Sequence, residues 1–132
     1  MDVPDHKLPA AYLEGVRLFN SREFFDCHDV LEELWSETIG EETLFYQGLI
    51  QAAVVLFHFE NGNLGGARKM YESSRKLLAP YTPKYHQMNV TKFQNAMRFC
   101  FRDLLTSDTV YPSGVELEES TVPAIELDSN NI

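Results

Sequence analysis

The residues best able to do chemistry begin in the stretch "FFDCHDVLEELW", residues 24–35, where a histidine and a glutamate stand four residues apart. On a helix, His28 and Glu32 project from the same side, so their side chains can meet. An imidazole beside a carboxylate can exchange a proton, bind a metal ion or hydrogen-bond a ligand. His28 falls among the apolar residues of this stretch with Glu32 at their edge, whereas Asp26 and Asp29 fall on the opposite side. The pattern therefore predicts a buried His28–Glu32 pair.

A second polar group interrupts "LFYQGLIQAAVVLFHF", residues 44–59, which is otherwise apolar on every side. Gln47, Gln51 and His58 are spaced by four and seven residues and fall within roughly 40° of each other on a helical wheel. Buried amides and imidazoles must be hydrogen-bonded, since an unpaired one costs about 1–3 kcal/mol. We therefore expect this stripe to face the first pair inside the protein. The candidate site comprises His28, Glu32, Trp35, Gln47, Gln51 and His58, with Trp35 as a core anchor or pocket wall.

Three interpretations of this cluster stay open. It could be a closed hydrogen-bond network that fixes the helix register, the wall of a small-ligand pocket, or a metal site. In a metal site, two histidines and one carboxylate would suit zinc or non-haem iron. The metal interpretation has the least support, because the sequence contains no H-x-x-x-H motif, no E-x-x-H motif and no cysteine pair, and glutamine is a poor ligand. We therefore expect no bound metal and no cofactor.

Helices must position these side chains. Hydrophobic periodicity and terminating residues predict five of them, at about Pro9–Asn20, Arg22–Thr38, Glu42–Glu60, Leu64–Ala79 and Val90–Thr106. Ser21, Asn63 and Asn89 are expected to cap the second, fourth and fifth helices. The predicted fold is all-α, a single-domain bundle of about five helices with the third buried at its centre. Gly48 in that third helix would let a neighbouring helix approach closely.

The character of the chain changes after residue 110. We expect residues 1–110 to form the helical bundle and residues 111–132 to form an acidic, extended C-terminal tail. Two prolines and the lack of a helical stripe favour a mobile, solvated tail. The alternative is an extended segment lying along the bundle or along a second subunit. It is favoured by the apolar residues Val115, Leu117, Val122, Ile125 and Leu127.

Composition limits the partners and the location. The 132 residues carry a formal net charge of −9 at pH 7, which repels phosphate backbones and anionic lipid, so we expect no nucleic-acid partner and no membrane. Cys27 and Cys100 form no C-x-x-C pair and are expected to be reduced packing residues. The opening "MDVPDHKLPA" lacks the features of a signal peptide. We therefore expect a soluble, cytoplasmic protein.

Several of these motifs, in this order, resemble the family called domain of unknown function 309. The matching stretches are "FNSREFFDCHDVLEELW", "FYQGLIQAAVVLFHF" and "NGNLGGARKMYESSRKLL". The resemblance covers about residues 10–106 and implies a small, all-helical bacterial or archaeal protein, but it implies no established activity. A weaker resemblance, of the third and fourth helices to one tetratricopeptide-type hairpin, favours a role in protein interaction.

Together these features favour a non-catalytic binding or protein-interaction module with a buried His/Glu/Gln cluster. Its partner would be another protein, a second copy in a homodimer, or a small molecule. The alternative is a small-ligand-binding protein or metal-dependent enzyme that uses His28, Glu32, Gln51 and His58. Two other sets of residues are expected to be solvated. Arg68 and Arg75 share a side with Glu72 at ion-pair spacing, and His86 stands alone in a loop rich in Pro and Tyr.

Overall fold

The structure, a computed structural model, describes residues 8–106 and 117–128. Its helices are α1 Ala10–Asn20, α2 Phe24–Ser36, α3 Glu42–Glu60, α4 Leu64–Leu78, α5 Val90–Cys100 and α6 Arg102–Leu105. A short 3-10 turn, Ala79–Tyr81, leads into an antiparallel hairpin of two strands, β1 Lys84–Tyr85 and β2 Met88–Asn89. A second 3-10 turn is Glu119–Thr121. The all-α prediction is confirmed, and the small hairpin is an element that the hydrophobic pattern did not predict.

Two of the three predicted helix caps are confirmed. The side chain of Asn63 accepts a hydrogen bond from the backbone N–H of Gly66, 3.1 Å away. The side chain of Asn89 accepts one from the N–H of Lys92, 2.9 Å away. Each bond satisfies one of the backbone donors that the first turn of a helix leaves without a partner. The starts of α4 and α5 are therefore set by local sequence.

The other predicted boundaries need correction. Ser21 does not cap α2, because Arg22 has φ +64° and cannot start a right-handed helix. Ser21 instead closes α1, where its hydroxyl donates to the carbonyl oxygen of Arg17 at 3.0 Å. The predicted fifth helix is interrupted at Phe101, which separates α5 from α6. The structure thus has six helices in its described part rather than five.

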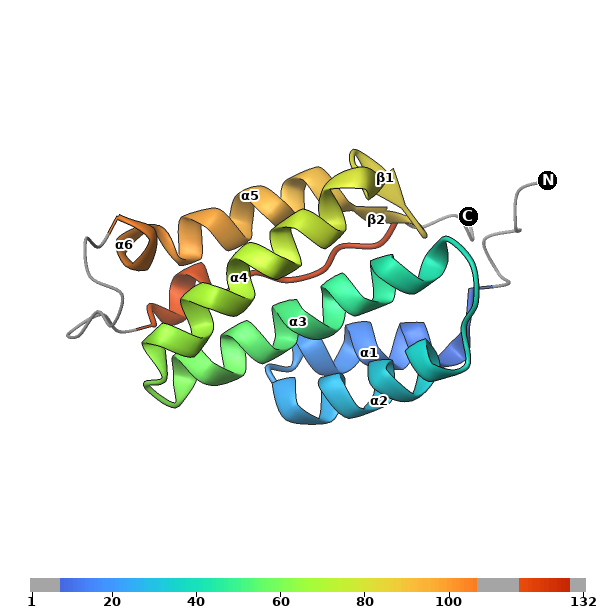
Figure 1. The fold of residues 1–132 in the computed structure, drawn as a ribbon, viewed down its shortest axis with the longest axis horizontal. Coiled ribbons are helices and arrows are strands. Elements are labelled where there is room, and N and C mark those ends of the chain that lie inside the picture. The colour runs from blue at the N-terminus through green and yellow to red at the C-terminus, as the bar shows by residue number, and fades with distance from the viewer. Residues whose placement is uncertain (1–7, 107–116, 129–132) are drawn as a thin grey trace.

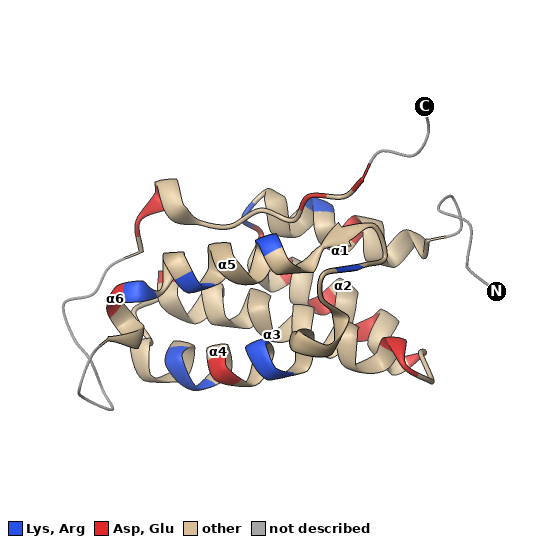
Figure 2. Ribbon diagram, turned by 90° about the horizontal axis from the view of Figure 1, so that it is seen from above, with Lys and Arg blue, Asp and Glu red and all other residues tan. Residues whose placement is uncertain are grey.

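Helix α3 lies between α2 and α4 in one layer, and α1, α5 and residues 117–128 form a second layer (Figure 1, Figure 2). A Cβ on Gly48 would lie 2.7 Å from Leu78 Cγ, so this glycine allows α4 to approach closely, as predicted. Ser74 of α4 donates its hydroxyl to the Gly48 carbonyl at 2.8 Å. None of the helices in the described ranges is both long and apolar enough to cross a membrane.

Both cysteines are core residues. Cys27 and Cys100 are free and buried, and burial raises the pKa of the Cys27 thiol to about 12. A thiol with so high a pKa is almost entirely protonated at neutral pH and is therefore a poor nucleophile. The prediction that both cysteines are packing residues is confirmed.

Residues 117–128 lie along the bundle. Asn20, at the end of α1, makes two hydrogen bonds to the backbone of Ile125: its Nδ2 donates to the carbonyl at 2.9 Å, and its Oδ1 accepts from the N–H at 2.8 Å. Ile125 is only 3% exposed, and Leu127 forms an antiparallel bridge with Met88. This part of the chain therefore follows the extended alternative rather than the solvated one.

Ion pairs hold the acidic side chains of this segment to the bundle. They join Lys84 to Asp128, Lys92 to Glu126 and Arg102 to Glu118. The acidic character of the segment thus matches basic residues on β1, α5 and α6. Val115 and the predicted boundary between residues 110 and 111 lie outside the described residues.

Replacing Asn20 by alanine should release this segment. The change removes both hydrogen bonds to Ile125, so the free energy of unfolding should fall by about 1–3 kcal/mol. The Ile125 amide should also exchange its hydrogen faster, as measured by hydrogen–deuterium exchange. Asn61→Ala is the control, because the Asn61 side chain donates only to Phe57 in its own helix. Unchanged protection of Ile125 in Asn20→Ala would show that other contacts hold the segment.

Candidate functional site

His28 lies on the side of α2 that borders α3. Its side chain is 25% exposed, with Nε2 3.3 Å from Glu32 Oε2 and Nδ1 3.3 Å from Asp29 Oδ1. The predicted His28–Glu32 pair therefore exists, but the prediction that Glu32 is buried is wrong, since its side chain is 57% exposed. Glu32 thus lies at the edge of this side of α2, where its carboxylate reaches water. Asp29, as predicted, is also exposed, at 59%.

The polar stripe of α3 faces outward and not into the core. Gln47, Gln51 and His58 are each partly exposed, and they lie in line with Leu44 and Val54, the other partly or fully exposed residues of that side. The remaining sides of α3 are packed against α2, α4 and the second layer. The prediction that this stripe is enclosed within the bundle is therefore wrong. Its residues are aligned because they share the open side of the helix.

His58 lies near the C-terminal end of α3. Its Nδ1 lies 3.3 Å from the side-chain nitrogen of Asn63, the residue that caps α4. Its backbone carbonyl also accepts from the Asn63 N–H at 2.8 Å. The histidine therefore helps to hold the turn between α3 and α4. In residues 8–106 and 117–128, no group of three or more His, Cys, Asp or Glu side chains is arranged to hold a metal ion.

The two helices nevertheless share one open face. The Phe25 ring of α2 lies 5.6 Å from the Phe57 ring of α3, which places the His28 side of α2 beside the open side of α3. We call this surface the α2–α3 face. It consists of Phe25, His28, Glu32 and Trp35 of α2 with Leu44, Gln47, Gln51, Val54 and His58 of α3.

Three polar atoms on the α2–α3 face are buried and form no hydrogen bond: His28 Nδ1, Trp35 Nε1 and Gln51 Oε1. The Asp29 oxygen near His28 Nδ1 is within ion-pair distance, but the contact lacks the geometry of a hydrogen bond. A buried polar atom without a partner is destabilising by about 1–3 kcal/mol. Such atoms need a hydrogen bond from water or from a bound molecule to satisfy them. Of the sequence-based interpretations, a saturated internal network does not fit these three atoms.

A second cluster surrounds His86 and was missed. His86 and Gln87 form the two-residue loop of the β1–β2 hairpin, with φ +49° and +63°, the left-handed geometry that tight hairpins require. The His86 side chain is only 12% exposed. Its ring stacks on Tyr85 at 4.4 Å between centroids and meets the edge of Tyr12 at 5.4 Å. The prediction of a solvated loop histidine is therefore wrong.

The polar contacts of His86 come from the start of α3. Its Nε2 lies 2.9 Å from Glu42 Oε2 and 3.1 Å from the Tyr46 hydroxyl. A carboxylate can only accept, so Nε2 carries the proton and donates it to Glu42. Burial lowers the pKa of His86, while Glu42 acts in the opposite direction. The only sequence signal was the density of aromatic residues near His86, because Glu42 lies 44 residues away.

The α2–α3 face lies in a segment shared with other proteins. Residues 12–70 match the family described as Domain of unknown function (DUF309). This confirms the resemblance inferred from the motifs, although the match ends at residue 70, short of the expected residue 106. The DUF309 segment contains every residue of the α2–α3 face, but it does not reach His86.

Two relatives share part of this chain. "Uncharacterized protein YpuF" of Bacillus subtilis is 35% identical over 72 residues, which cover 53% of this chain and 41% of YpuF. An uncharacterized protein of Aquifex aeolicus is 41% identical over 51 residues, which cover 38% of this chain and 15% of that protein. The chain thus spans less than half the length of each relative.

Replacing Gln51 by leucine should leave the free energy of unfolding unchanged or raise it by up to about 1 kcal/mol, because Gln51 Oε1 loses no hydrogen bond. Ser74→Ala is the contrasting variant, since the buried Ser74 hydroxyl does have a partner, and it should lower stability by about 1 kcal/mol. Chemical denaturation measures both. A loss of more than about 1 kcal/mol in Gln51→Leu would mean that Gln51 is a structural residue.

The lowered pKa of His86 predicts a loss of stability in mild acid. The unfolded chain takes up this proton at its ordinary pKa of 6.5, above the pKa in the folded protein. The contribution of His86 to the free energy of unfolding is therefore present above pH 6.5 and is lost as the pH falls below it. His86→Asn should reduce this slope below pH 6.5, whereas Glu42→Gln should steepen it. Denaturation curves at several pH values measure the slope, and an unchanged slope in His86→Asn would contradict the assignment.

Proposed function

We propose that the protein is a protein-binding module whose α2–α3 face holds an apolar and cationic segment of a partner. The observation that carries this proposal is the group of three unpartnered polar atoms, on His28, Trp35 and Gln51, gathered on one partly exposed face. A segment laid along the face could donate to Gln51 and accept from Trp35 once these side chains turn outward. The proposed partner is a protein segment, because the groups are spread along two helices.

Apolar residues border these polar atoms. Phe25 is 55% exposed and Leu44 is 49% exposed, at opposite ends of the face. Trp35 is partly exposed and packs against the core. Interfaces obtain most of their binding energy from a few such aromatic and apolar anchors surrounded by polar groups. The mixture on the α2–α3 face is of this kind.

The negative charge of α2 indicates that the partner segment is positively charged. The exposed acids of α2 and its C-cap are Asp26, Asp29, Glu32, Glu33 and Glu37, and the helix has no lysine or arginine. Figure 2 shows these acidic bands without a basic one. A segment with Lys or Arg beside its apolar residues would therefore be attracted to this edge, and an acidic one repelled.

The comparisons are consistent with a module. The DUF309 segment includes the whole face, and in the two relatives the matching residues make up 41% and 15% of longer chains. A binding surface contained in one segment can serve proteins of different length. This supports the proposal without assigning the activity of the relatives to this chain.

The test is selection from a displayed library of random peptides. The exposed stripe of α3 from residue 44 to residue 58 is about 21 Å long, so helical peptides of roughly 15 residues are long enough to span it. We expect selected peptides to be rich in aromatic residues and in Lys or Arg. Phe25→Ser should weaken their binding by about tenfold or more, since a hot-spot residue contributes over 1 kcal/mol.

Leu13→Ser is the matched control, because Leu13 is a 44% exposed apolar residue of α1, outside the face. It should leave peptide binding unchanged. Peptides that bind equally to wild type and Phe25→Ser would contradict the proposal. So would a homodimer that Phe25→Ser dissociates, since the face would then belong to a second copy of the chain.

A further inference from the structure

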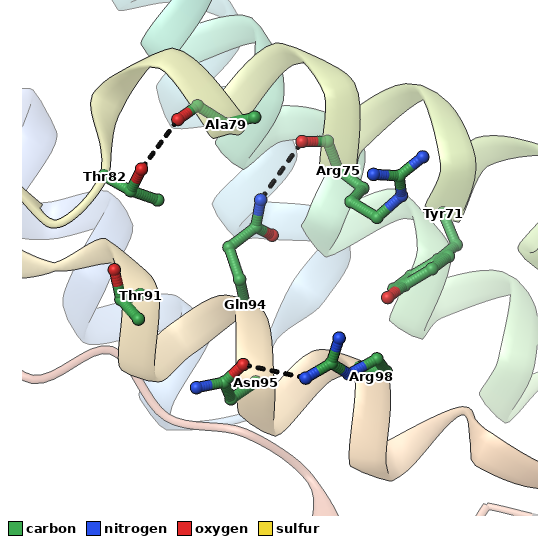
Figure 3. Close-up of a pocket in the computed structure, with 8 residues that line it drawn as sticks. All are labelled: Tyr71, Arg75, Ala79, Thr82, Thr91, Gln94, Asn95 and Arg98. Atoms are coloured by element: carbon green, nitrogen blue, oxygen red, sulfur yellow. Dashed lines mark hydrogen bonds between the residues drawn. The ribbon is translucent and has the colours of Figure 1, made fainter.

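A cleft between α4 and α5 gathers cationic side chains in a protein that is acidic as a whole. It has a volume of about 330 Å³, with Tyr71 and Arg75 on one wall and Asn95 and Arg98 on the other (Figure 3). A second hollow of about 460 Å³ adjoins it and shares Tyr71, Arg75 and Arg98. Clefts of this size suit small molecules. The three shared residues therefore lie where a ligand in either hollow would meet them.

The positive charge of this cleft exceeds its negative charge. Arg75 and Arg98 line both hollows, and Glu72 is the one carboxylate among the described residues that line them. Glu72 Oε1 binds Arg75 at 3.0 Å, and both side chains are about half exposed. In the described ranges, the hydrogen-bond partner of Arg98 is the neutral amide oxygen of Asn95, at 3.1 Å. That contact orients the Arg98 guanidinium without neutralising its charge.

The sequence alone predicts a different role for these residues. Arg68 and Arg75 are expected to form a solvated, salt-bridged face with Glu72, because the three residues are spaced along one side of a single helix. The fold adds Arg98 from α5, 23 residues after Arg75, and Tyr71 stands beside both guanidiniums (Figure 3). Burial and Glu72 raise the pKa of Tyr71, whereas Arg75 and Arg98 act against them. The tyrosine thus keeps its proton at neutral pH and can donate it in a hydrogen bond.

We infer that this cleft binds the phosphate group of a small molecule, either free phosphate or a phosphate monoester. Two guanidinium forks from different helices can share the oxygens of a phosphate dianion, whose two negative charges match the two cations. Asn95 adds an amide donor, since its oxygen is already taken by Arg98, and Thr91 adds a hydroxyl. A nucleic acid is disfavoured because the net charge of −9 repels an extended polyanion. This site is separate from the α2–α3 face.

NMR titration of the isotope-labelled protein with inorganic phosphate and with phenyl phosphate tests the inference. At about pH 7.5 the phosphate is mainly a dianion. We expect saturable shifts of the side-chain amide of Asn95 and of the Arg98 Nε–H. Arg98→Gln and Arg75→Gln should each weaken binding about tenfold or more, because each removes charge-assisted hydrogen bonds.

Lys76→Gln is the charge-matched control, because Lys76 is an exposed cation of α4 that does not line the cleft. It should change binding by less than about twofold. Tighter binding of phenyl phosphate would assign an organic ester as the ligand, and equal binding would assign free phosphate. Equal weakening by Lys76→Gln, shifts that do not saturate, or binding of a phosphoserine peptide alone would each overturn the inference. None of these outcomes depends on the α2–α3 face.

Discussion

Helix α3 can face water along one stripe only, and the other helices are placed by the need to cover the rest of it. Ten of its residues are buried, from Phe45 to Phe59, and each large apolar side chain removed from water contributes about 1.5–3 kcal/mol. Helices α2 and α4 cover its flanks, and the second layer covers its inner side (Figure 1). The missing side chain of Gly48 lets α4 come close enough to do so.

The open stripe follows from the same constraint. The polar side chains of α3 are therefore expected on its uncovered side. Gln47, Gln51 and His58 are the partly exposed polar residues there. Polar residues aligned on an otherwise apolar helix can have two causes: they contact another helix, or no helix packs over that side. In α3 the second cause applies. Three polar atoms on this face are nevertheless shielded and lack a partner within the described chain.

Local features were predictable because their causes are local. The start of α4 depends on Asn63 and an N–H three residues later, and helix α3 has the boundaries that its apolar pattern predicts. The sites depend on contacts between distant residues, which a helical wheel cannot show. Glu42 meets His86, and Asn20 meets Ile125, across 44 and 105 positions of sequence. The exposure of Glu32 was mispredicted for a related reason, since periodicity shows which residues share a side but not what covers that side.

The charges of α2 and α4, on opposite flanks of α3, give the layer an electric polarity. Helix α2 carries only acids, and α4 carries four basic residues against Glu72 (Figure 2). Such a separation of charge steers an approaching molecule before it touches the surface. A cation is drawn to the α2 edge and an anion to the α4 edge. This orienting effect acts over about one Debye length, roughly 8 Å at physiological salt. Rates of encounter at both edges should therefore depend on ionic strength even where the final contacts are apolar.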